Sequence, residues 1–60
     1  MDLSIYLNKK VHIILHDRFT YIGVVIDADD NSLTLIDKNN SRVSLKESAI
    51  DFIKEVYNGI

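Results

Sequence analysis

The chain of 60 residues contains no cysteine, no proline and no tryptophan, and it has only two glycines. Without cysteine it forms neither disulfides nor thiolate zinc sites. A domain of this length buries only about 60% of the surface that its unfolded chain exposes, so its core is marginal. Such domains usually gain stability from disulfides, a metal or a partner subunit. We therefore expect a single domain, residues 1–60, which packs unusually well or associates with itself, and we favour self-association.

The chain also lacks a strong charge of either sign and a long apolar run. Seven basic and nine acidic residues give a formal net charge of −2 and a pI near 5.4. Proteins that hold nucleic acid mainly through their overall field are usually strongly basic, so any nucleic-acid site must be local. No apolar stretch approaches the roughly 20 residues of a membrane-spanning helix, and the first residues lack the pattern of a secretory signal. We therefore expect a cytoplasmic protein with no membrane partner.

Alternating apolar residues predict an antiparallel β-sheet. Asp2 stands where an N-cap would start a short helix that contains Leu3, Tyr6 and Leu7. The pattern that follows predicts four strands joined by short polar turns, at residues 11–15, 19–29, 33–36 and 41–46. The second strand is apolar on both faces, so we expect it to be central in the sheet. Gly23 in its middle indicates a sharp bend or a close approach of another backbone segment.

The C-terminal segment, residues 45–58, fits two local patterns. Ser44 and Glu47 resemble a capping box, and apolar residues recur at helical spacing from Ala49 to Tyr57. This local pattern favours a helix. The alternative is a fifth strand near residues 49–56, apolar on both faces because it lies between neighbouring strands.

An ordered series of residues along most of the chain resembles the Sm-like family, which comprises the Sm and LSm proteins, archaeal Sm-like proteins and bacterial Hfq. The series is Val11, Ile13, Leu15, Asp17, Arg18, Tyr21, Gly23, Val25 and Asp29, followed by Leu33, Leu35, Ile36 and Asp37. It is similar to the first Sm motif, in which an apolar strand, a basic turn residue, an aromatic residue, glycine and aspartate keep this order. The resemblance covers residues 3–56.

The resemblance implies a mainly β fold, namely a five-stranded, strongly bent antiparallel barrel with a short N-terminal helix over its open end. It makes the C-terminal segment a fifth strand. It also implies a homo-oligomeric ring, in which the fourth strand of one subunit pairs with the fifth strand of the next. Such rings bind uridine-rich or adenine-rich single-stranded RNA without catalysis, so the expected protein is not an enzyme and needs no cofactor.

Aligned with the family, five residues correspond to the RNA-binding positions. They are Asp30, Asn31 and Ser32 in the turn after the second strand, and Lys46 and Glu47 after the fourth. Ser32 stands at the position of the family's usual Asn, and Lys46-Glu47 stands where the family has Arg-Gly or Lys-His. Lys46 supplies one cation, whereas Asp30 and Glu47 would repel phosphate. An alternative function is therefore a ring of the same fold that acts as a protein-interaction scaffold with little or no RNA binding. A third is a monomeric barrel whose C-terminal helix attaches to a larger complex.

A second candidate surface consists of Lys9, Lys10 and Arg18, with Phe19 and Tyr21 nearby in the sequence. Basic residues interleaved with aromatic ones suit a strand of RNA. The alternative is a solubilising border around a barrel whose aromatic residues belong to the core.

Two patterns resemble metal ligands but lack essential features. Asp27, Asp29 and Asn31 copy the opening of a calcium loop, but the loop's glycine and its final glutamate are missing. His12 and His16 are four residues apart, which on a strand separates them by about 13 Å, too far to share one zinc ion. We therefore predict no metal site and, because no acid, base or nucleophile converges on a pocket, no catalytic residue.

Overall fold

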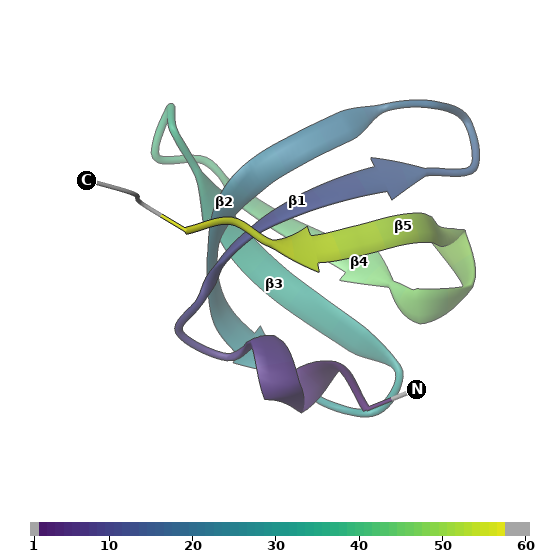
Figure 1. Ribbon diagram of the computed structural model, residues 1–60, viewed down its shortest axis with the longest axis horizontal. Coiled ribbons are helices and arrows are strands. Elements are labelled where there is room, and N and C mark those ends of the chain that lie inside the picture. Colours follow the sequence, from purple (N-terminus) through teal and green to yellow (C-terminus); the bar gives the residue numbers. More distant parts are fainter. Residues whose placement is uncertain (1, 58–60) are drawn as a thin grey trace.

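The structure is a computed structural model that describes residues 2–57. Two short 3-10 helices and five strands follow one another along the chain: η1 (Leu3–Tyr6), β1 (Lys10–Leu15), β2 (Thr20–Ala28), β3 (Ser32–Asp37), β4 (Arg42–Lys46), η2 (Glu47–Ala49) and β5 (Ile50–Glu55). The strands form one antiparallel sheet in the order β4-β3-β2-β1-β5 (Figure 1). The predicted mainly β fold and the central position of β2 are confirmed.

The sheet does not close into the predicted barrel. Its two ends are β4 and β5, and neither strand pairs with the other within the described residues. The predicted N-terminal helix is a 3-10 helix of four residues. Within residues 2–57, neither helical segment has the length and apolar character of a membrane-spanning helix.

The C-terminal segment is a strand, so its local helical pattern was misleading. The residues of β5 pair with β1 from Val11↔Glu55 to Leu15↔Ile50, and only Glu47–Ala49 before them is helical. Ser44, expected by that local pattern to cap a helix, lies in β4, where its hydroxyl is 3.0 Å from that of Thr34 on β3. Residue 58, the end of the segment considered, lies outside the described residues.

Among residues 2–57, seven side chains make up the buried core. They are Leu3, Val11, Ile13, Val25, Leu33, Leu35 and Leu45. Six of them come from alternate positions of β1 to β4, so they lie on one face of the sheet, as the period of two requires. The opposite face of β2 stays largely uncovered, because Ile22, Val24 and Ile26 are each more than 40% exposed. The core is therefore one-sided and small.

Gly23 lies where the backbone of β3 comes close to β2. A Cβ atom built at this position would be 2.2 Å from the carbonyl oxygen of Ile36 and 3.0 Å from the Cα of Asp37. The pairing of the same two strands shifts between Val25 and Asp27, which indicates a β-bulge. The sequence-based expectation of a close backbone approach at Gly23 is confirmed.

The segment η1 packs against one end of β2 and β3, at the bottom of Figure 1. Asp2 caps it, because its carboxylate accepts the backbone N–H of Ser4 at 3.0 Å. Leu3 is fully buried and its N–H donates to the carbonyl of Asp29. Leu7, expected to pack with it, is 40% exposed. Tyr6, also expected in this helix, is partly buried and packs against the core, so Leu3 and Tyr6 both anchor this segment.

Candidate functional site

The five residues expected to contact RNA come together at one end of the β3–β4 ribbon. Ser32 is paired with Lys46, and the backbone N–H of Glu47 donates to the carbonyl of Asn31 at 2.7 Å. The turn between β2 and β3 and the connection between β4 and β5 therefore form one continuous surface. We call residues 29–32 and 46–49 the rim.

Asp29 organises the first half of the rim. Its carboxylate accepts the N–H groups of Asn31 at 2.8 Å and Ser32 at 2.9 Å, and also the Ser32 hydroxyl at 3.3 Å. These bonds stabilise the ionised form, so the backbone N–H groups of Asn31 and then Ser32 lower the pKa of Asp29 below its ordinary value. The turn thus has a defined shape that leaves Asp30 and Asn31 exposed.

The charge of the rim is mostly negative. Residues 29–32 and 46–49 contain three acidic residues, Asp29, Asp30 and Glu47, and one basic residue, Lys46. A depression at this turn, lined by residues 27–29 and 32–34, has a volume of about 20 Å³, which is room for about one water molecule. The rim therefore offers one cation and exposed backbone turns, and this depression is too small to enclose a base.

The second candidate surface does not form a single cluster. Lys9 and Lys10 lie at the start of β1, and Lys9 Nζ is 3.5 Å from Glu55 Oε1. Arg18 lies in the turn beyond the end of β1, where its φ of 73° is left-handed. The six residues of β1 separate these cations by about 20 Å. They do not face a ligand together.

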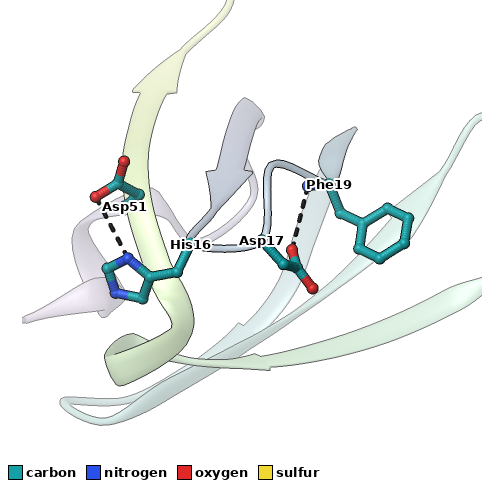
Figure 2. Close-up of polar contacts among 4 residues, drawn as sticks. All are labelled: His16, Asp17, Phe19 and Asp51. Carbon is teal, nitrogen blue, oxygen red and sulfur yellow. Dashed lines mark hydrogen bonds and ion pairs between the residues drawn. The ribbon is translucent and has the colours of Figure 1, made fainter.

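Two further side chains meet near that β1–β2 turn, at a place that sequence reasoning did not select. His16 Nδ1 lies 3.4 Å from Asp51 Oδ1, an ion pair when the imidazole is protonated (Figure 2). In the same view Asp17 accepts the N–H of Phe19 at 3.2 Å, and Phe19 is 64% exposed. His12 instead packs edge-on against Phe52, at 6.3 Å between ring centroids. No group of three or more metal-ligating side chains occurs among residues 2–57.

A wide groove of about 640 Å³ lies over the exposed face of β2. Ile22, Val24 and Ile36 contribute to its lining, together with residues 37–39 of the β3–β4 turn. Its only signal in the sequence is that β2 is apolar on both faces.

Comparison with known proteins adds no constraint, because no family model, curated protein or solved structure matches the chain.

Proposed function

We propose that copies of this chain join edge to edge into a ring and that the ring binds single-stranded RNA at its rims. The observation that carries the proposal is the contact between the β2–β3 turn and the β4–β5 connection. Ser32 lies opposite Lys46, and the backbone N–H of Glu47 donates to the carbonyl of Asn31. These are the positions that the resemblance to Sm-like proteins assigns to RNA. Among residues 2–57 no strand pairs with the outer edges of β4 and β5, and this also supports the proposal, because an edge strand is a template for pairing with another chain.

The binding would be non-catalytic and multivalent. One rim presents a single cation, so one copy alone would bind weakly. A ring repeats the same weak site around its axis, and the repeated sites raise the overall affinity through effective concentration. Because phosphate contacts release counterions, the affinity would fall steeply with added salt.

A second function is favoured by the charge of the rim. With Asp29, Asp30 and Glu47 beside Lys46, the rim would repel a phosphate backbone more than it attracts one. The same ring would then be a scaffold for protein partners, and its rims would remain free of RNA.

Two measurements decide between these functions. Sedimentation or light scattering gives the mass, and a stable monomer at micromolar concentration would refute the ring. Fluorescence anisotropy with uridine-rich and adenine-rich oligonucleotides at about 50 mM salt, where phosphate contacts are strongest, tests RNA binding. Absence of binding to both would leave the scaffold.

The contribution of the rim is tested by Lys46→Gln, which removes the cation without adding a negative charge. The matched control is Lys38→Gln, the same change at an exposed lysine in the turn at the other end of the β3–β4 ribbon. We expect RNA affinity to fall for the first variant only. The mass of both variants is measured on the same samples, so that a loss of affinity is separated from a loss of assembly.

A further inference from the structure

The hydrogen bonds of the β3–β4 ribbon define which groups of β4 face outward. Glu47 donates to Asn31 at one end of the ribbon, and Asp37 donates to Ser41 at the other. Hydrogen-bonded and non-bonded pairs alternate along an antiparallel ladder. The residues of β4 whose backbone groups point away from β3 are therefore Arg42, Ser44 and Lys46, and we call these three the basic edge.

The alternation of hydrogen-bonded pairs between β1 and β5 likewise defines the outer edge of β5. Val56 donates to the carbonyl of Lys10, so the backbone groups of Ile53 and Glu55 point away from β1. Asp51 has no opposite residue in β1, because the register shifts between Ile14 and Leu15. We call Asp51, Ile53 and Glu55 the acidic edge.

The two edges carry opposite charges at matching positions. Each has charged residues at its ends and an uncharged residue in its centre. Two basic edges, paired antiparallel about Ser44, would place arginine opposite lysine, and two acidic edges paired about Ile53 would place aspartate opposite glutamate. Like charges directly opposite destabilise a pair of strands and opposite charges stabilise it. The edge charges therefore favour a head-to-tail contact between β4 of one copy and β5 of another.

We infer that these edges pair antiparallel in a single register, with Ser44 opposite Ile53 of the next copy. This inference rests on the proposed ring and specifies its interface. The register places Arg42 opposite Glu55 and Lys46 opposite Asp51, so that both charged pairs are complementary.

Other registers lose this match. A shift by two residues, the smallest that keeps the hydrogen bonds, places Arg42 opposite Ile53 or Lys46 opposite Ile53, and both ion pairs disappear. In a parallel pair, a residue whose backbone groups face the partner lies opposite one whose groups face away. The basic edge would then lie level with Phe52 and Lys54, which offer no negative charge.

Each carboxylate of the acidic edge already has a cation of its own chain nearby. Lys9 Nζ is 3.5 Å from Glu55 Oε1, and His16 Nδ1 is 3.4 Å from Asp51 Oδ1 (Figure 2). A carboxylate has two oxygens with about four acceptor sites, so it can accept a second cation. The side chains of Glu55 and Asp51 retain 30% and 64% of their exposure, which leaves room for a cation from the next copy.

The experiment measures subunit association by sedimentation velocity for one charge reversal and two possible rescues. Arg42→Glu replaces an attraction by a repulsion, and we expect it to weaken association about tenfold. Adding Glu55→Arg restores the opposite pair and should recover most of that loss. Adding Asp51→Arg instead should weaken association further, because both pairs of the inferred register are then repulsive. Lys38→Glu, the same charge change away from both edges, should leave association unchanged.

A second arm tests the head-to-tail arrangement. The variant Arg42→Glu/Lys46→Glu has two acidic edges, and the variant Asp51→Lys/Glu55→Lys has two basic edges. We expect each to remain monomeric alone and an equimolar mixture to assemble. Far-UV circular dichroism of every variant identifies loss of the fold.

Three outcomes overturn these ideas in distinguishable ways. A monomeric wild-type protein refutes the proposed ring, and the register with it. A wild-type oligomer for which Arg42→Glu behaves like Lys38→Glu refutes the edge charges alone. Rescue by Asp51→Arg in place of Glu55→Arg refutes the register and leaves the head-to-tail contact standing.

Discussion

Replacing Gly23 by alanine tests how closely β2 and β3 approach each other. The added Cβ would lie 2.2 Å from the carbonyl oxygen of Ile36 and 2.8 Å from its carbonyl carbon, whereas real Cβ atoms essentially never come within 3.0 Å of other atoms. The obstacle is backbone, so it cannot move aside by changing a rotamer. The central strand β2 and its neighbour β3 would have to separate.

The cost is large compared with the stability of so small a domain. Overpacking a core lowers the free energy of unfolding by about 1–3 kcal/mol and occasionally more. Because the obstacle here is backbone, we expect Gly23→Ala to lower it by about 3 kcal/mol or more. A 60-residue domain has a free energy of unfolding of about 3–9 kcal/mol, at roughly 0.05–0.15 kcal/mol per residue. We therefore expect the variant to lose a third or more of its stability, or to be unfolded at room temperature.

The assay is urea denaturation followed by circular dichroism, repeated at several protein concentrations because self-association adds to the apparent stability. Thr20→Ala, on the exposed first residue of the same strand, is the control and should change the free energy of unfolding by about 0.5 kcal/mol or less. If Gly23→Ala were as stable as this control, the close approach of β2 and β3 would be refuted.

Three further predictions concern the rim, the core and η1. The lowered pKa of Asp29 means that its ionised form stabilises the fold above the ordinary aspartate pKa of about 3.9, and that this contribution is lost as pH falls through the lower, folded-state pKa. Asp29→Asn should therefore be less stable at pH 7 and show a flatter loss of stability between pH 5 and pH 2 in acid titrations followed by circular dichroism. Leu35→Ala should cost about 2–5 kcal/mol in urea denaturation, whereas Ile26→Ala, which is 41% exposed in the native chain, should cost under about 1 kcal/mol. Leu3→Ala should release η1 from the sheet, seen by NMR as faster hydrogen exchange of the Asn8 amide, which donates to β2 at 2.8 Å.

The parts of the fold that sequence predicted are those decided by near neighbours. Alternation of apolar residues located β1 to β4, because one face of each strand contributes to the buried core. Gly23 indicated a close approach, since a glycine inside a strand otherwise weakens it. The turn at Asp29 follows from the ability of an aspartate side chain to bond the N–H groups that follow it.

The C-terminal segment shows where this local reasoning fails. Its apolar residues from Ala49 onward recur at helical spacing. The segment is nevertheless a strand, because its backbone pairs with the edge of β1. Val11 and Leu15 define that edge, and they lie about forty residues earlier in the chain. A contact of such sequence separation overrides local propensity and leaves little trace in the segment itself.

The candidate site was predictable only in part, because some of its residues belong to a sequence motif and others are brought into place by distant strands. Lys46 and Ser32 could be selected from an ordered motif, and their pairing is a consequence of the β3–β4 ribbon. Asp51 could not be selected, because its lack of an opposite residue in β1 depends on a register shift between two distant strands. Which backbone groups remain unpaired is decided by the whole sheet and not by any one strand.

Lys46 links the two proposals, because it belongs both to the rim and to the basic edge. In the inferred register its ammonium group is engaged by Asp51 of the next copy. The rim would then retain Asp29, Asp30 and Glu47 without a free cation, and assembly would reduce its attraction for phosphate. If Lys46→Gln weakens assembly but no oligonucleotide binds the wild-type ring, Lys46 holds subunits together and the scaffold function follows. The other outcome is that the ring binds RNA, and that added salt weakens both RNA binding and assembly. Lys46 then serves both contacts, and adding RNA would shift the mass distribution of the ring.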